Sequence, residues 1–258
     1  MRHRFFLGGQ DLEMAEIRAL LDRHAPGQVE DKALSWGAKA SDYHDELLTA
    51  LARGETPVLI ELEEDLPDTV LDPARIVIVD HHGRRAGSDA ATSIEQVWQL
   101  LGLSAVELPR RLMLVAANDR AHVAGLLEAG ATAGEVADIR LADRKSQGVS
   151  AADEAEAGRA IAAGRQDGRV TVIETVSTTS SAIADQILPA LGGPDYDRLL
   201  VVMPDKVAVF GDGAAIHALA EAYPGSWWGG DLPRAGFWGT MRPERDVTFV
   251  GKLVDRIK

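Results

Sequence analysis

A β-branched run that ends in three polar residues constrains this chain more than any other stretch. Residues 76–79 (IVIV) predict a strand buried on both faces of a sheet. Asp80, His81 and His82 follow at its carboxyl end, which is where open α/β sheets bind ligands. Carboxylate and imidazole together suit Zn²⁺, Mn²⁺ or Fe²⁺. A polar turn that closes a strand is the alternative, but two adjacent histidines beside an aspartate favour a site.

Composition limits the possible classes of protein. At 258 residues, 46% of them hydrophobic, the chain can form one large α/β domain or two smaller ones. The absence of cysteine excludes disulfides and thiolate metal sites. A net charge of −13 makes long nucleic acid an unlikely partner and favours a small phosphorylated substrate.

The sequence indicates no membrane association. No apolar stretch approaches the roughly 20 residues that span a bilayer. The hydrophobic start of the chain meets Gly8 too early to form a secretory signal. We therefore expect a cytoplasmic protein, and a homo-oligomer is possible.

The first half of the chain alternates strand and helix signals. Strands are predicted near residues 4–7, 58–60, 76–79 and 111–117. The i, i+3, i+4, i+7 spacing of Ile17, Leu20, Leu21 and His24 predicts a helix after the first strand. Thr92 to Glu95 has the form of a capping box that starts another helix. Strands interleaved with helices imply a mostly parallel sheet.

The second half predicts a helical segment and then a smaller α/β domain. Residues 126–168 are rich in alanine and charge, and the polar stretch 140–148 within them is expected to be a solvated helix face, with substrate contact as the alternative. Strands at residues 170–173, 199–202 and 206–210 and a helix at 181–191 follow. We expect an N-terminal metal-binding domain (1–125), a helical connector (126–168) and a substrate-binding domain (169–258).

Acidic residues follow the other predicted strands of the first domain, and they are Asp11, Glu13, Glu61 and Asp119. Because neighbouring parallel strands end at a common edge, these acids and the Asp80–His82 triplet are expected to converge. Packed carboxylates repel one another unless a proton or a cation neutralises them. A divalent metal site that activates water against a phosphoester bond is the hypothesis, and helix N-capping is the alternative for each acid alone.

The sequence 79–82 (VDHH) resembles the signature of the DHH phosphoesterases, and 229–237 (GGDLPRAGF) resembles the glycine-rich motif of their DHHA1 domain. The resemblance covers nearly the whole chain. It implies a manganese site at a sheet edge and a second domain that binds substrate. It also implies roles: metal ligands at Asp11, Glu13, Glu61, Asp80, His81 and Asp119, with Asp80 alternatively orienting His81, and catalytic residues at Asp80, His81 and His82, where His82 contacts the scissile phosphate.

The sequence departs from the family pattern at three positions. Leu7 stands where the first motif has a histidine, and Glu13 and Glu61 stand where aspartates are expected. These changes leave open whether one or two ions bind. His122, three residues after Asp119, can replace the lost ligand if that segment is helical.

The second motif is the expected substrate-binding region. The residues assigned to it, together with His82, are Gly229, Gly230, Asp231 and Arg234, with backbone N–H groups and Arg234 holding the phosphate. Asp231 replaces a common histidine, which argues against a heavily charged polyphosphate. Two functions remain open: a metal-dependent phosphohydrolase or phosphodiesterase acting on a small phosphoester, and a degenerate relative that binds a nucleotide or partner without hydrolysis.

Overall fold

The structure is a computed structural model that describes residues 2–82, 90–243 and 248–258. It divides into two compact units, Met1–Gln147 (unit 1) and Gly148–Lys258 (unit 2). The expected connector, residues 126–168, is shared between them. Residues 126–147 belong to unit 1, whereas 148–168 belong to unit 2 and already include a strand, β5 (Arg165–Asp167).

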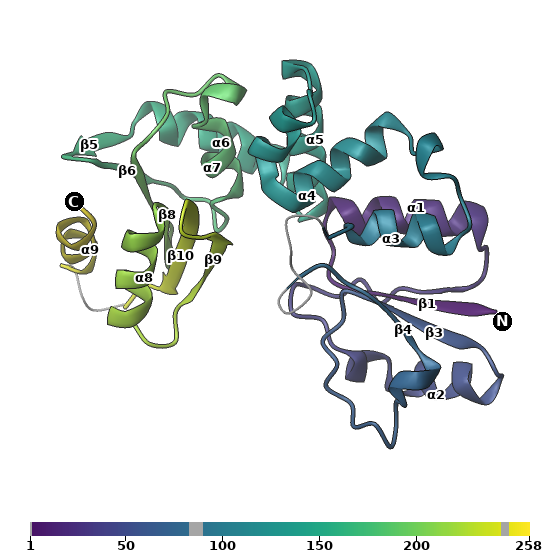
Figure 1. Cartoon of the computed structure of the whole chain (residues 1–258). Coiled ribbons are helices and arrows are strands. Elements are labelled where there is room, and N and C mark those ends of the chain that lie inside the picture. Colours follow the sequence, from purple (N-terminus) through teal and green to yellow (C-terminus); the bar gives the residue numbers. More distant parts are fainter. Residues whose placement is uncertain (1, 83–89, 244–247) are drawn as a thin grey trace. The chain divides into compact units, whose positions relative to one another are not determined.

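Unit 1 is built on a four-stranded parallel sheet of order β2-β1-β3-β4 (Figure 1). Its strands are β1 (His3–Leu7), β2 (Val29–Glu30), β3 (Thr56–Ile60) and β4 (Val77–Val79). The predicted strand at 76–79 is present, but it lies at the edge of the sheet, so Val77 and Ile78 are only half-buried. Its side chains do meet apolar clusters on both faces, which explains the continuous β-branched run.

Helices cover both faces of this sheet. Helices α1 (Leu12–His24) and α3 (Ser93–Leu100) pack over Phe5 and Val58 on one face (Figure 1). Helix α2 (His44–Ala52) packs over Phe6 and Leu59 on the other. Burial of these alternating apolar side chains stabilises unit 1 and fixes where each strand ends.

The predicted fourth strand of this unit is wrong. Residues 111–117 belong to α4 (Arg110–Glu128), which is followed by α5 (Ala133–Ser146). The six apolar residues that follow Arg111 do not distinguish a buried helix from a buried strand. Five of these residues are buried and pack the helix against the rest of unit 1, and they are Leu112, Leu114, Val115, Ala116 and Ala117. The predicted capping box at Thr92 and Glu95 is confirmed at the start of α3.

Unit 2 contains a six-stranded mixed sheet of order β5-β6-β7-β8-β10-β9. The predicted strands correspond to β6 (Val170–Glu174), β7 (Arg198–Val202) and β8 (Lys206–Gly211), and β9 (Trp227–Asp231) and β10 (Ala235–Met241) form a hairpin. Helices α6 (Ala151–Ala162) and α7 (Ser181–Gln186) cover one face, and α8 (Gly213–Ala222) and α9 (Phe249–Ile257) cover the other. The expected helix 181–191 is shorter because Pro189 begins a separate 3₁₀ turn. The fold class, α/β with a parallel sheet in the first domain and a smaller α/β second domain, is confirmed.

Among the described residues, no helix is both long enough and apolar enough to cross a membrane.

Candidate metal centre

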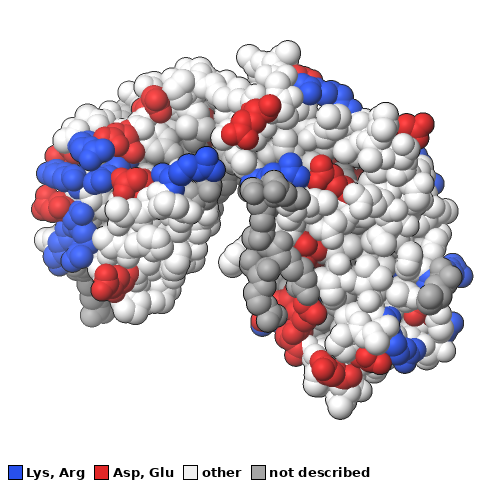
Figure 2. Space-filling model, viewed as in Figure 1, with Lys and Arg blue, Asp and Glu red and all other residues white. Residues whose placement is uncertain are grey.

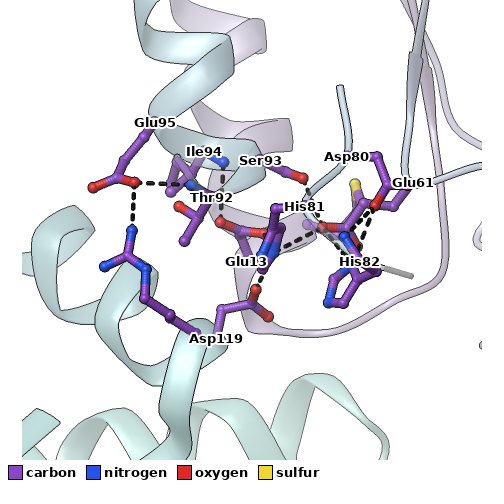
Figure 3. Close-up of polar contacts among 12 residues, drawn as sticks. Glu13, Glu61, Asp80, His81, His82, Thr92, Ser93, Ile94, Glu95 and Asp119 are labelled. Carbon is purple, nitrogen blue, oxygen red and sulfur yellow. Dashed lines mark hydrogen bonds and ion pairs between the residues drawn. The ribbon is translucent and has the colours of Figure 1, made fainter. Parts of the chain in front are cut away.

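The candidate site of unit 1 lies at the carboxyl ends of three neighbouring strands. Asp11 and Glu13 follow β1 at the start of α1, Glu61 follows β3, and residues 80–82 follow β4. The convergence expected from parallel strands is therefore present for these residues. Asp119 reaches the same place from α4, so its approach has a different structural origin (Figure 3).

Close backbone packing brings the ends of β1 and β3 together. A Cβ atom at Gly8 would lie 2.6 Å from the carbonyl oxygen of Glu61 and 2.7 Å from that of Ile60. Glu61 itself has a φ of +51°, a left-handed conformation that costs an ordinary residue of order 1–3 kcal/mol. Its N–H donates to the carbonyl of Val79 on β4, which holds the turn in place. The sequence shows the glycine but not the reason for it.

The first turn of α3 holds the two glutamates. The backbone N–H of Ile94 donates to Glu13 Oε1 at 3.0 Å, and the hydroxyl of Ser93 donates to Glu61 Oε1 at 2.7 Å (Figure 3). A helix N-terminus favours negative charge, so both carboxylates are placed where their charge is stabilised. Sequence reasoning identified this turn as a cap and missed its contact with the site. The only signal was its polar sequence before an apolar helix.

His81 is the centre of the cluster. Its Nε2 atom lies 2.5 Å from Asp119 Oδ2, 3.6 Å from Glu13 Oε2 and 3.6 Å from Glu61 Oε1. Glu13 and His81 are 2% and 8% exposed, so these groups meet away from bulk water. Glu13 Oε2, His81 Nε2 and Asp119 Oδ2 are buried and make no well-directed hydrogen bond to any described residue. Buried polar atoms are rarely left in this state, and three around one point call for a common partner.

Burial and mutual repulsion perturb the acids of the site. Burial raises the pKa of Asp11 to about 7, although its N-cap hydrogen bond from the Met14 N–H opposes this shift. Burial, followed by the charges of Glu13 and Asp119, raises the pKa of Glu61 well above its ordinary value. For His81, burial lowers the pKa, but contact with Asp119 and Glu13 outweighs it and raises the pKa to about 10. Without a cation, a proton on His81 therefore offsets part of the negative charge of these carboxylates.

The donors fit a divalent metal ion. Glu61, His81, His82 and Asp119 each offer one atom, and these atoms lie within 4.8 Å of one another. Atoms bound to one ion at about 2.1 Å are separated by roughly 3–4 Å, close to the 3.6 Å between His81 and each glutamate. Carboxylate oxygen with imidazole nitrogen suits Mn²⁺, Fe²⁺ or Zn²⁺. The 2.5 Å contact between His81 and Asp119 must lengthen slightly if both bind the ion.

Asp80 and His82 differ from His81 in their surroundings. Asp80 Oδ1 accepts the backbone N–H of His82 at 2.8 Å and lies outside the group of potential ligands, so its contact supports the turn. The side chain of His82 is 56% exposed, with Nδ1 3.7 Å from Glu61 Oε1 and its ring 4.1 Å from that of His81. His82 is thus the member of the triplet that faces solvent.

His122, which was considered as a ligand from the sequence, and Leu7, which stands at a ligand position of the family pattern, lie elsewhere. Leu7 is 1% exposed and packs in the apolar core of unit 1. His122 has a φ of +54° at a break in α4, so the helical spacing from Asp119 is not realised. It is exposed and is not in the group of potential ligands.

The stretch at 140–148 is only in part the solvated face that we expected, since Leu141, Lys145, Gln147 and Gly148 are exposed. Arg140, Asp143 and Arg144 on α5 are buried, each at most 6% exposed. Charge-rich composition does not reveal that the Arg140–Asp143 ion pair is buried, because its burial depends on packing against distant parts of the chain. Arg140 Nη1 contacts both Asn118 and Asp143.

The glycine motif of unit 2 forms the β9–β10 hairpin. Gly230 has a φ of +113°, and a Cβ there would lie 2.6 Å from the Cα of Gly236. These glycines therefore allow close strand pairing, whatever they bind. Arg234 lies in the exposed connecting turn. Asp231 belongs to β9, but its side chain is outside what the structure describes.

Comparison with known proteins identifies the fold. No family model matches the sequence, and no curated protein matches it. The DHH domain of a member of a family of ribosomal proteins superposes with a TM-score of 0.58 at 14% identity, over 100% of this chain and 87% of that one. The chain has a DHH/DHHA1-type fold, divergent in sequence, as its motifs indicated.

Two further solved structures were found at lower similarity. One is PggH, a pGpG-specific phosphodiesterase from Vibrio cholerae, with 12% identity, a TM-score of 0.45, and coverage of 100% of this chain and 99% of that one. The other is RecJ from Thermus thermophilus in complex with Mn²⁺, with 15% identity, a TM-score of 0.48 and coverage of 99% of this chain. This chain spans about half, 51%, of that RecJ.

The pKa shifts predict how stability depends on pH when the site holds no metal. The pKa of His81 is raised above its unfolded value, so its proton stabilises the fold fully below about pH 6.5, and this contribution is lost as pH rises toward about 10. Asp11 and Glu61 also bind protons more tightly when folded, so they act in the same direction. Chelated protein should therefore unfold at a lower temperature at pH 8.5 than at pH 6, and Mn²⁺ should reduce the difference.

Thermal unfolding with EDTA or Mn²⁺ at both pH values checks this result. About 0.3 M KCl is added because salt screens interactions between exposed charges more strongly than those within the buried cluster. If the chelated protein is more stable at pH 8.5 than at pH 6, the predicted effect of the raised pKa values of the site is wrong.

Proposed function

We propose that the chain is a metal-dependent phosphohydrolase or phosphodiesterase that acts on a small phosphoester, such as a short oligonucleotide or a nucleotide-derived compound. One observation carries the proposal: three buried donor atoms of Glu13, His81 and Asp119 meet at one point without a hydrogen-bond partner among the described residues. The DHH-type fold is consistent with it. The family resemblance favours Mn²⁺ among the ions that suit these donors.

We assign a role to each residue of the candidate metal centre in unit 1. Glu61, His81 and Asp119 hold the ion, Glu13 is assigned as a further ligand because its Oε2 lies 3.6 Å from His81 Nε2, and the contacts from Ser93 and Ile94 keep the glutamates in place. A bound divalent ion lowers the pKa of water and neutralises charge that develops on a phosphoester. His82 is exposed beside this group, so we assign it the contact with the scissile phosphate. Asp80 orients His82 through its backbone, and Asp11 caps α1 beside Glu13.

The substrate is proposed to be small for electrostatic reasons. The chain carries a net charge of −13, and acidic side chains lie among the basic ones on the face that Figure 2 shows. Such a surface disfavours the many phosphate contacts that long nucleic acid needs. In unit 2, we propose that Arg234 and the backbone around Gly229 and Gly230 bind substrate phosphate. A cytoplasmic location stays a prediction.

Binding without hydrolysis is the second candidate function. Leu7 has no atom that can bind a metal, so the ligand that the family has at this position is lost. Fewer donors weaken metal binding, and a site that holds its ion poorly can still bind a nucleotide. Measuring turnover distinguishes hydrolysis from binding without hydrolysis more clearly than counting whether one or two ions bind.

Turnover of a substrate panel tests the proposal. Metal-free protein is supplied with Mn²⁺, Mg²⁺ or Zn²⁺ and given pyrophosphate, a dinucleotide, a nucleotide bisphosphate or bis(p-nitrophenyl) phosphate. We expect Mn²⁺ to raise turnover of at least one diester at least about 100-fold above the EDTA control. Metal binding with no turnover of any substrate would favour the second candidate. If the protein neither binds a metal ion nor turns over any substrate, both candidate functions are overturned.

A further inference from the structure

A buried polar network behind the candidate metal centre joins three helices of unit 1. Arg140 on α5 donates from the single atom Nη1 to Asn118 Oδ1 and to Asp143 Oδ2, both at 2.7 Å. Gln147 also donates to Asp143 Oδ2, at 3.2 Å. Asn118, Arg140 and Asp143 are 7%, 4% and 6% exposed. The network is therefore shielded from water and directional.

One end of this network holds the segment that carries Asp119. Asn118 directly precedes Asp119, and α4 leaves helical geometry two residues later, at Ala121 and His122. Residues before such a break lack the continuous hydrogen-bond ladder that fixes orientation inside a helix. The bond from Arg140 to Asn118 supplies a fixed point from outside α4.

The other end holds the start of α1. Asp143 Oδ1 accepts the backbone N–H of Leu12 at 3.4 Å, and Leu12 lies between Asp11 and Glu13. Arg140 and Asp143 thus connect the two segments that bring Glu13 and Asp119 to His81. A buried ion pair adds little net stability compared with apolar side chains of similar size, but its bonds fix geometry.

We propose that Arg140 and Asp143 are positioning residues that set the distance between Glu13 and Asp119 and so the affinity of the centre for its metal ion. This inference rests on the proposed metal centre. Neither residue touches the ion or the reacting atoms in this arrangement. They act through Asn118 and Leu12, as residues behind metal ligands commonly do.

The test measures Mn²⁺ affinity separately from folding. Arg140→Met removes the guanidinium and keeps most of the side-chain volume, and Asn118→Leu removes the acceptor beside Asp119. Mn²⁺ titrations followed by electron paramagnetic resonance give the Kd and the spectrum of the bound ion, and thermal unfolding with EDTA gives the stability of the metal-free fold. We expect Arg140→Met to raise the Kd about tenfold and to change the bound spectrum, and Asn118→Leu to raise the Kd at least about threefold.

Arg110→Met is the matched control. Arg110 bonds to Glu135 in an exposed ion pair that also links α4 to α5, so its loss should leave the Kd within about twofold of wild type. An unchanged Kd and spectrum in the network variants, with only the unfolding temperature lowered, would overturn the positioning role. If Arg140→Met does not fold, the Mn²⁺ Kd and the spectrum of Asn118→Leu decide whether the network has a positioning role. Failure of the wild type to bind Mn²⁺ would instead overturn the metal centre itself.

Discussion

Replacing His81 by alanine should abolish metal-dependent turnover and most of the metal binding. His81 Nε2 is the atom that Glu13, Glu61 and Asp119 share as a neighbour, so its removal leaves buried carboxylates without a central donor. We expect turnover to fall at least about 1000-fold and the Mn²⁺ Kd to rise at least about 100-fold. Steady-state rates on whichever substrate responds, with Mn²⁺ binding by calorimetry, check both numbers.

His24→Ala is the control for a general effect of losing an imidazole. His24 is exposed in the last turn of α1, and its replacement should leave rate and affinity unchanged. Turnover that survives His81→Ala would place the chemistry elsewhere in the chain. Loss of turnover in both variants would indicate damage to the fold.

Replacing Gly125 by alanine should destabilise unit 1 by about 3 kcal/mol. A Cβ atom at this position would come closer than 3.0 Å to the carbonyl oxygen of Ala117, and would also meet the Ala121 side chain at 3.1 Å. Gly125 lies just after the break in α4, where the chain folds closely against the segment that carries Asp119. Chemical denaturation with matched m-values measures the change in free energy of unfolding.

Replacing Gly134 by alanine should have the opposite effect on the free energy of unfolding. Gly134 lies in the first turn of α5, and a Cβ there would meet nothing within 4 Å. Alanine is the better helix former, so Gly134→Ala should stabilise by up to about 1 kcal/mol. If Gly125→Ala also stabilises, helix propensity outweighs the close approach and the contact between Gly125 and Ala117 does not constrain the break in α4.

Local pattern was sufficient for much of the fold. The spacing of Ile17, Leu20 and Leu21 predicted α1, and the capping box at Thr92 predicted the start of α3. These signals arise within one or two turns of chain, so no distant contact can reverse them easily. The apolar run 111–117 was too short for its period to be recognised, and only burial inside unit 1 decided that it is helical.

The candidate site was likewise predicted in part from local pattern, and the rest depended on tertiary packing. The acids after β1 and β3 and the triplet after β4 were recognised because parallel strands end at one edge. Asp119 was recognised for a wrong reason, since it comes from a helix. The contribution of Ser93 and the burial of Arg140 and Asp143 had no local signal, because each depends on a partner at least 22 residues away or on packing.

The sequence by itself determined the order of the elements and the chemistry at their ends: a parallel α/β unit whose strands end in acids and histidines, followed by a second α/β unit. These properties follow from hydrophobic period and from residue type, which are local. Only the tertiary structure decided that Glu61, His81, His82 and Asp119 come within 4.8 Å of one another, that Glu13 lies 3.6 Å from His81, and that His122 does not join them. Convergence to within a few ångströms depends on backbone turns, helix breaks and close glycine contacts, and these are set by the packing of distant segments.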